Sequence, residues 1–163
     1  MILNQMQMRV SSHFAKLPAC EPLCVMAPRR SGKTTLLCAL AIKLAESGKR
    51  VTIIVSCQRL KRETVDIIEK LCGNVGYCGV IEVKSDKEST TLDNFDVVLL
   101  DEAAYIDPGF IADTVAPLMI SKPFTTLVMI GSPKSSTNIF NKFCRTGGPI
   151  NHVINCMVPM ANL

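Results

Sequence analysis

Short apolar runs alternate along the chain with stretches whose apolar residues recur at helical spacing. The apolar runs stand at residues 22–28, 51–56, 95–102, 125–131 and 152–159. The helical stretches include residues 32–46 and 58–72, which end at Gly48 and Gly73. Short strands separated by helices are typical of a parallel sheet covered on both faces. The sequence therefore predicts an α/β fold with a doubly wound, mainly parallel sheet.

The remaining stretches give weaker signals. Residues 75–94 predict a minor strand and a charged turn, and residues 135–145 predict a short helix. Asp107-Pro108 predicts the start of a helix that runs to about Met119, with Asp107 as its N-cap. On the helix at 58–72, the inner side is predicted to consist of Leu60, Thr64, Ile67 or Ile68, and Leu71.

Length and composition indicate one compact domain. With 163 residues and 48% hydrophobic content, the chain can bury one sizeable core. We divide it into an N-terminal segment, residues 1–22, and a domain at residues 23–163. No apolar run approaches the roughly 18 to 20 residues that span a bilayer, so we expect a soluble chain without membrane association. Its eight cysteines form no C-x-x-C pair, which favours reduced cysteines in an intracellular protein over a zinc site.

Residues 27–35 read APRRSGKTT and carry the first chemical signal. Gly-Lys-Thr matches the second half of the phosphate-binding pattern G-x-x-x-x-G-K-[ST], although Ala27 replaces the first glycine. A strand precedes this loop and a helix follows it, so backbone N–H groups and the helix dipole would face bound phosphates. We therefore expect ATP and Mg²⁺, with Lys33 at the β- and γ-phosphates and Thr34 on the metal ion. The predicted nucleotide-binding residues are Pro28, Arg29, Arg30, Ser31, Gly32, Lys33, Thr34 and Thr35.

Two acids follow a second apolar run, in the sequence DVVLLDEAA. Asp101 is predicted to hold Mg²⁺ at the carboxyl end of a strand, and Glu102 to polarise the attacking water. The alternative interpretation is a strand that ends in acids because it reaches the surface. Together with the phosphate loop, the pair favours a hydrolase over a protein that only binds nucleotide.

A third run, TTLVMIGSPKSSTN, ends in Gly131 and Ser132. Its strand is predicted to lie between the two nucleotide-binding strands and to bring the Ser132 hydroxyl to the γ-phosphate, where it would report hydrolysis. By composition alone, a turn explains Gly-Ser-Pro equally well.

The two arginines of the loop narrow the interpretation, since a guanidinium near the γ-phosphate neutralises charge in the transition state. At this point the sequence resembles the ATPase domain of the large terminase subunit, the DNA-packaging motor of herpesviruses and tailed phages. Those proteins carry arginine before x-G-K-[ST] and often lack the leading glycine, as APRRSGKT does. The segments VVLLDEAAYI and LVMIGSPKSSTN resemble the herpesvirus type. The resemblance covers residues 23–158.

This resemblance implies a P-loop NTPase of the RecA-like, ASCE class and a role for each motif residue. It makes Lys33 a catalytic phosphate ligand, Thr34 and Asp101 the magnesium residues, and Glu102 the catalytic carboxylate. Arg29, or alternatively Arg30, is the cis-acting catalytic arginine. Gly131 and Ser132 occupy the coupling segment, although this chain has Gly-Ser-Pro where the herpesvirus type has consecutive Ser and Thr residues. Gln5 or Gln7 is a candidate for an adenine contact, and ordinary surface is the alternative.

The resemblance also implies partners and a compartment. We expect double-stranded DNA held through its backbone, a homo-oligomeric ring, and contacts with the portal and other terminase subunits. A herpesvirus-like source implies the host nucleus, and a phage source the bacterial cytoplasm. The net charge of +4 neither demands nor excludes nucleic acid. Candidate DNA contacts, which could equally form a solvated face, are Arg59, Lys61, Arg62, Lys134 and Lys142.

A complete large terminase continues into a nuclease built on clustered carboxylates, whereas no acid follows Asp113 here. We expect either a fragment or exon product, or a nuclease on another polypeptide. Two other functions remain open. One is the motor domain of a superfamily one or two helicase, which shares the loop and the acidic pair. The other is an assembly subunit that binds nucleotide without turnover.

Overall fold

Within the described residues, six parallel strands form one sheet in the order β3-β2-β4-β5-β1-β6. The computed structural model describes residues 4–16, 21–73, 80–88, 91–134, 139–146 and 152–156. The strands are β1 (Leu23–Met26), β2 (Val51–Val55), β3 (Ile81–Ser85), β4 (Val97–Leu100), β5 (Thr126–Gly131) and β6 (His152–Asn155). The predicted doubly wound sheet is confirmed, and all of its described strand pairs are parallel.

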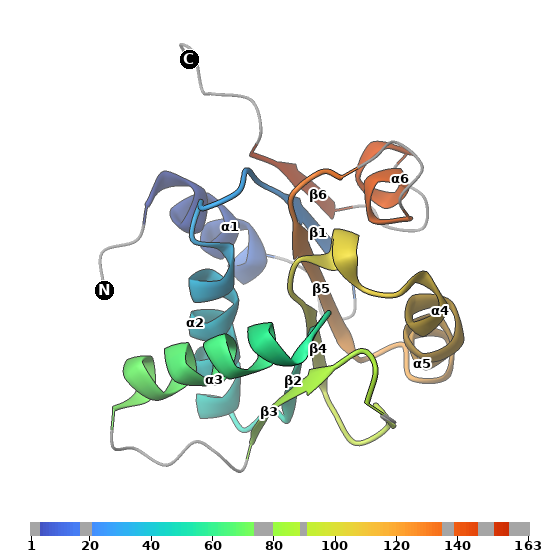
Figure 1. Cartoon of the computed structure of the whole chain (residues 1–163), viewed down its shortest axis with the longest axis horizontal. Coiled ribbons are helices and arrows are strands. Elements are labelled where there is room, and N and C mark those ends of the chain that lie inside the picture. Colours follow the sequence, from blue (N-terminus) through green and yellow to red (C-terminus); the bar gives the residue numbers. More distant parts are fainter. Residues whose placement is uncertain are drawn as a thin grey trace.

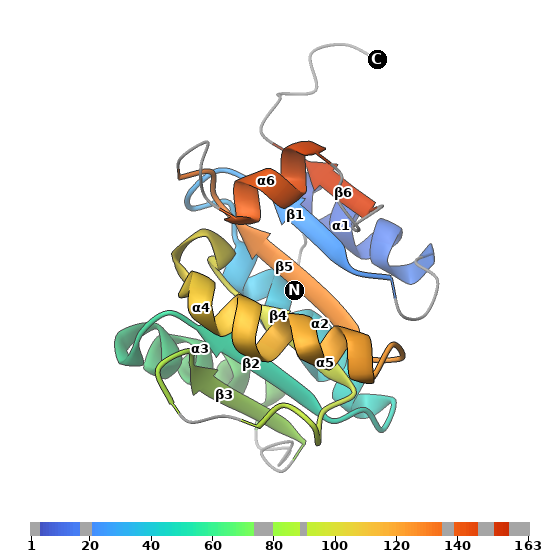
Figure 2. The same ribbon diagram turned by 90° about the vertical axis from the view of Figure 1, so that its right-hand side faces the viewer.

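Helices cover both faces of the sheet (Figure 1). One face carries α1 (Gln5–Lys16), α2 (Lys33–Glu46) and α3 (Gln58–Cys72). The other carries α4 (Pro108–Phe110), the π-helical η2 (Ile111–Val115), α5 (Ala116–Ser121) and α6 (Ile139–Thr146). Figure 2 shows α4, α5 and α6 in front of strands that all run in one direction. A 3-10 turn, η1 (Ala103–Tyr105), follows β4.

The strands are continuous apolar runs because both of their faces are buried. In β1, Val25 faces the α1–α3 layer while Cys24 faces the opposite layer. Ile53 and Ile54 divide in the same way on β2. Each such side chain contributes about 1.5–3 kcal/mol when it is fully buried. The two apolar layers therefore fix the register that aligns the strand ends.

The N-terminal helix α1 was not predicted, and its Val10 is buried in the same apolar layer as α2 and α3. On α3 the prediction for Leu71 was wrong, because this side chain is 37% exposed. The inward row instead runs Thr64, Ile68 and Cys72, at a spacing of four residues. No helix among the described residues has the length and apolar character needed to cross a bilayer.

The helix predicted to begin at Asp107 exists but is irregular. Asp107 occupies the N-cap position without a side-chain capping bond, and its own N–H donates to Asp86 Oδ2 at 2.8 Å. The helix then passes through the π-helical η2 before Pro117, which has no N–H to donate to an earlier carbonyl. Residues 135–138 of the helix predicted at 135–145 and 157–159 of the predicted last strand lie outside the described residues.

Candidate active site

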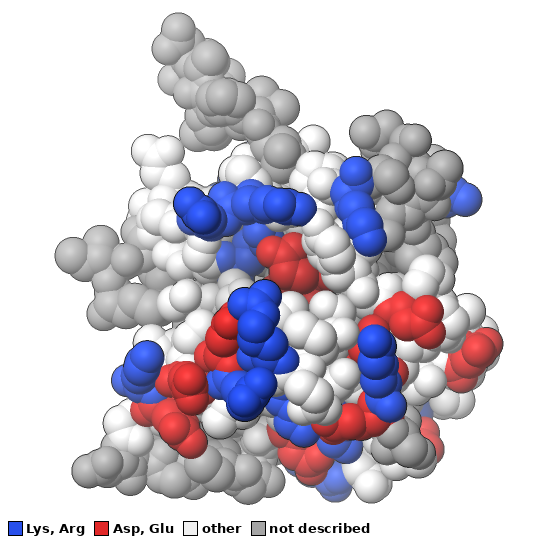
Figure 3. Space-filling view, in the orientation of Figure 1, with Lys and Arg blue, Asp and Glu red and all other residues white. Residues whose placement is uncertain are grey.

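Three neighbouring strands end at one edge of the sheet and bring the predicted motifs together. Strand β5 lies between β4 and β1, as its sequence predicted. The phosphate loop follows β1, Asp101 and Glu102 follow β4, and Ser132 follows β5. In open parallel sheets, ligands bind outside the carboxyl ends of the strands. Figure 3 shows basic side chains gathered around a recessed acidic group on this face.

The loop after β1 is braced by its own backbone. The Pro28 carbonyl accepts hydrogen bonds from Ser31 Oγ at 2.8 Å and from Lys33 Nζ at 2.9 Å. Gly32 has a φ of 83°, in the left-handed region that favours glycine. A Cβ at Gly32 would also lie 2.8 Å from Gln7 Nε2. Glycine is therefore favoured here by the backbone conformation, and a larger residue would also displace the Gln7 amide.

Lys33 is buried, with 4% of its surface exposed, and all three of its ammonium protons face oxygen acceptors. Its Nζ donates to Pro28 O and to Ser132 Oγ at 2.8 Å. The third partner is Glu102 Oε1, at 3.1 Å. The ammonium group thus joins the phosphate loop, the acidic pair and the end of β5. Phosphate oxygens entering this site would compete for the same protons.

Thr34 and Asp101 form the pair expected at a magnesium site. Thr34 Oγ1 donates to Asp101 Oδ2 at 2.7 Å, and the Glu102 N–H donates to Asp101 Oδ1 at 3.0 Å. Burial raises the pKa of Asp101 to about 6, although the Thr34 hydrogen bond opposes this rise. A hydroxyl and a carboxylate in contact are ligands that Mg²⁺ accepts. The residues present therefore fit the ion.

Glu102 has a left-handed backbone, with φ 47° and ψ 49°. For a residue with a Cβ this conformation is strained, and such strain persists where surrounding contacts enforce it. Here the Glu102 carboxylate accepts from the Ser132 N–H at 3.3 Å and pairs with Lys33. The strained backbone turns the carboxylate back over the strand ends, toward the phosphate loop.

The two loop arginines differ in their surroundings. Arg29 Nη2 donates to the Tyr105 hydroxyl at 2.5 Å, beside the acidic pair. The Lys134 ammonium lies 4.5 Å from the centroid of the same Tyr105 ring. Arg30 is exposed and has a φ of 59°. Of the two, Arg29 is the one in contact with the segment that follows β4.

The predicted coupling residues lie at a tight contact. A Cβ at Gly131 would meet Phe140 Cε1 at 3.1 Å and the Ala103 nitrogen at 3.2 Å. The end of β5 is therefore pressed against both α6 and the turn after the acidic pair. Ser132 is 4% exposed and contacts Lys33 and Glu102. These contacts join Lys33 and Glu102 to the end of β5, and Gly131 joins that end to α6.

Solved structures share this fold, although no model of a known protein family and no curated protein matches the chain. The ATPase domain of the large terminase from Thermus phage P74-26 has a TM-score of 0.60 at 19% identity, over 96% of this chain and 77% of that one. For the UvsW helicase of bacteriophage T4 the TM-score is 0.68 at 14% identity, over 95% of this chain and 60% of that one. For a hypothetical ATP-dependent RNA helicase from Sulfolobus tokodaii the TM-score is 0.66 at 15% identity, over 96% of this chain and 53% of that one.

The chain has a RecA-like P-loop fold. It spans about three-fifths of the UvsW chain and about half of the Sulfolobus one. Identities this low say nothing of activity. The chemistry of this P-loop domain is therefore argued from its own residues.

Sequence reasoning missed how the N-terminus supports the P-loop. Asn4 Nδ2 donates to Ser31 O at 2.9 Å, and Gln7 Nε2 donates to Gly32 O at 3.1 Å. Asn4 and Gln7 also exchange backbone-to-side-chain hydrogen bonds at 2.9 Å, which is a reciprocal helix cap. The spacing Asn-x-x-Gln was the available signal. Of the two candidate glutamines, Gln7 is buried at the loop and Gln5 is exposed.

Two of the candidate DNA-contacting residues on α3 are paired with acids. Arg59 contacts Glu63 at 2.7 Å and Lys61 contacts Glu88 at 2.8 Å. Arg62 is exposed on the same helix. Ion pairs at a surface are weak, so they do not prevent these side chains from turning to another anion.

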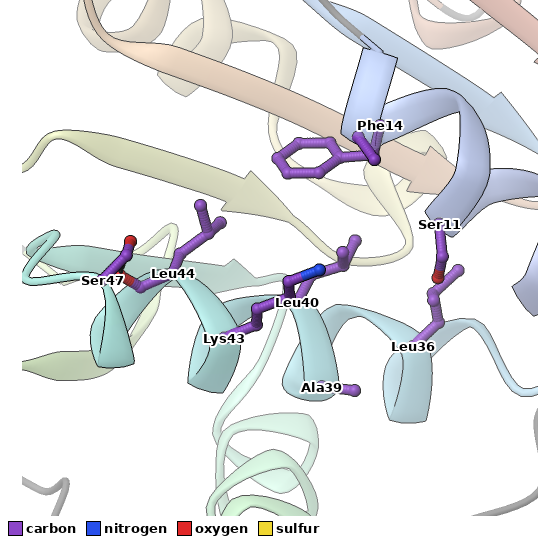
Figure 4. A pocket seen from close by; sticks show the side chains of 9 residues that line it. Ser11, Phe14, Leu36, Ala39, Leu40, Lys43, Leu44 and Ser47 are labelled. Atoms are coloured by element: carbon purple, nitrogen blue, oxygen red, sulfur yellow. Dashed lines mark hydrogen bonds between the residues drawn. The ribbon is translucent and has the colours of Figure 1, made fainter.

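A groove of about 620 Å³ lies between α1 and α2, away from the acidic pair. Figure 4 shows the Phe14 ring of α1 above the leucines of α2. Apart from Lys43, its lining residues are uncharged: Ser11, Phe14, Ala15, Leu36, Ala39, Leu40, Leu44 and Ser47. The groove is therefore mainly apolar, unlike the edge of the sheet at which Lys33 and Glu102 lie.

Proposed function

We propose that this chain is an ATP-hydrolysing motor domain that drives double-stranded viral DNA into a capsid, as part of a large terminase of the herpesvirus-like type. One observation carries the proposal: Lys33, Glu102 and Ser132 converge, and Thr34 and Asp101 adjoin them. A P-loop lysine, a pair of magnesium ligands and a carboxylate that can accept a proton are what phosphoryl transfer to water requires. The arginines in the P-loop favour a terminase among P-loop motors.

Each residue has a chemical role in this proposal. Lys33 binds the β- and γ-phosphate oxygens, and Arg29 stabilises negative charge on the γ-phosphate as its bond to the leaving oxygen breaks. Glu102 orients the attacking water and accepts its proton. When bound at Thr34 and Asp101, Mg²⁺ would neutralise charge on the phosphates. When the γ-phosphate leaves, the contacts of Ser132 change, and this change moves the end of β5.

The DNA would be held by its phosphates, since a packaging motor must accept any sequence. The basic residues available for such contacts are Arg59, Lys61, Arg62, Lys134 and Lys142. We further propose a homo-oligomeric ring that docks on a portal and on other terminase subunits. In a ring, one domain can move along the DNA while neighbouring domains keep the DNA bound.

A helicase motor domain is the second candidate. Its support is specific: the two helicase structures have TM-scores of 0.68 and 0.66, against 0.60 for the terminase domain. A single RecA-like domain with a P-loop and an Asp-Glu pair serves either function. The two functions differ in what happens to the base pairs.

The deciding experiment measures strand separation and translocation separately. The protein is incubated with ATP and either a forked duplex or a duplex that carries a third, triplex-forming strand. We expect ATP-dependent release of the third strand with the duplex intact. Lys33→Ala, which removes the phosphate ligand, is the control and should abolish release. Unwinding of the forked duplex would favour the helicase, and ATP turnover without either event would contradict a motor.

A further inference from the structure

Tyr105 lies between two cations that come from different segments. The Arg29 guanidinium donates to its hydroxyl at 2.5 Å, and the Lys134 ammonium lies 4.5 Å from its ring centroid. Arg29 follows β1, Tyr105 follows β4 and Lys134 follows β5. These three strands are neighbours in the sheet. The phenol thus connects the phosphate loop, the turn after the acidic pair and the segment after Ser132.

This contact is unusual in its charge. Within the described residues, no carboxylate pairs with Arg29 or Lys134, although Glu102 stands three positions before Tyr105. Two like charges near one neutral ring repel each other, and a nearby anion would offset that repulsion. The neighbouring phosphate loop is where that anion would bind.

We propose that Tyr105 is a positioning residue that orients Arg29 for phosphoryl transfer, with Lys134 holding the ring in place. This inference rests on the proposed ATP hydrolysis. A guanidinium carries five donors in a rigid plane, so one bond to the phenol leaves the others for phosphate oxygens. Without that bond, the flexible and exposed Arg29 side chain must be ordered during the reaction itself.

The physical consequence is a split between turnover and binding. An arginine that acts on charge developed in the transition state contributes to kcat and little to substrate binding. Loss of one hydrogen bond to a charged group should lower kcat by about tenfold. Loss of one exposed cation–π contact should lower kcat by about threefold. Both falls should depend on the presence of Arg29.

The test compares four variants with the wild type: Tyr105→Phe, Lys134→Met, Arg29→Ala, and Tyr105→Phe combined with Arg29→Ala. Tyr105→Phe keeps the ring for Lys134 and removes only the hydroxyl. The readouts are kcat and KM for ATP, together with the thermal unfolding midpoint. The proposal predicts a kcat lower by about tenfold in Tyr105→Phe, with KM changed by less than about twofold. For Lys134→Met the proposal predicts a kcat that is lower by about threefold.

The double variant separates positioning from a structural role. If Tyr105 acts through Arg29, the hydroxyl is worth nothing once Arg29 is gone, so Arg29→Ala and the double variant should have equal kcat. An equal loss on both backgrounds, or an unchanged kcat in Tyr105→Phe, overturns the inference while wild-type turnover stands. A wild type without turnover overturns the proposed function, and this inference with it.

Discussion

At the scale of single residues, the centre of the site is the ion pair between the buried Lys33 and the half-buried Glu102. The Lys33 side chain is 3% exposed and that of Glu102 is 25% exposed. Removing one member of such a pair leaves an uncompensated charge, which is costly in a protein interior. ATP would supply new acceptors for Lys33 and release the Glu102 carboxylate. Under the proposed function, the pair would exchange partners when phosphate binds.

Gly131 gives a sharp prediction about space. In Gly131→Ala, the new Cβ would press on the Phe140 ring and on the Ala103 backbone. Overpacking of this kind costs about 1–3 kcal/mol. We expect a lower free energy of unfolding, which thermal or urea unfolding measures, and weaker turnover because the Ser132 contacts shift.

Gly109→Ala is the matched control, because its Cβ would meet only the end of the Asp107 side chain. It lies within α4, where alanine is the better helix former, so its stability should be unchanged or higher. A Gly131→Ala protein as stable as Gly109→Ala would contradict the tight contact.

The motif residues could be predicted from the sequence because chain order places them at strand ends. Lys33, Thr34, Asp101 and Glu102 each follow a recognisable apolar run, and parallel pairing then brings them to one edge. The Arg29–Tyr105 contact could not be predicted. It depends on how two side chains cross the edge, and spacing along the chain carries no information about that.

At the scale of elements, α1 completes the P-loop. Its first turn reaches the loop through Asn4 and Gln7, and Val10 anchors the helix in the core. Neither apolar periodicity nor charge marked this helix, because its sequence QMQMRVSSHFAK is largely polar. Only the reciprocal Asn-x-x-Gln cap carried the information. The strands were easier to predict because burial on both faces leaves them uniformly apolar.

Gln7→Leu tests this support. The change keeps the size of a side chain that is 6% exposed but removes the donor to the Gly32 carbonyl and the acceptor of the Asn4 N–H. One hydrogen bond of this kind is worth about 1 kcal/mol, so affinity for a fluorescent ATP analogue should fall several-fold. Gln5→Leu is the control, because Gln5 is exposed on the same turn. Equal affinities in the two variants would exclude a role for Gln7 in holding the loop.

At the scale of the whole molecule, one sheet links the site to the opposite helical layer. The acidic pair and Ser132 stand at the ends of β4 and β5, and the contacts of Gly131 lead from there to α6. In the proposed motor, loss of a phosphate would therefore be transmitted to α6.

The most direct test of the central claim is Glu102→Gln, measured for ATP affinity and single-turnover hydrolysis in the same protein. Glutamine keeps the size of the side chain and one acceptor oxygen, for either Lys33 or the Ser132 N–H, but it cannot accept a proton. We expect ATP to bind and turnover to fall by about 100-fold or more, which is the contribution of a general base. Glu63→Gln, on the exposed face of α3, should leave both values unchanged. Turnover in Glu102→Gln equal to the wild type would contradict the account.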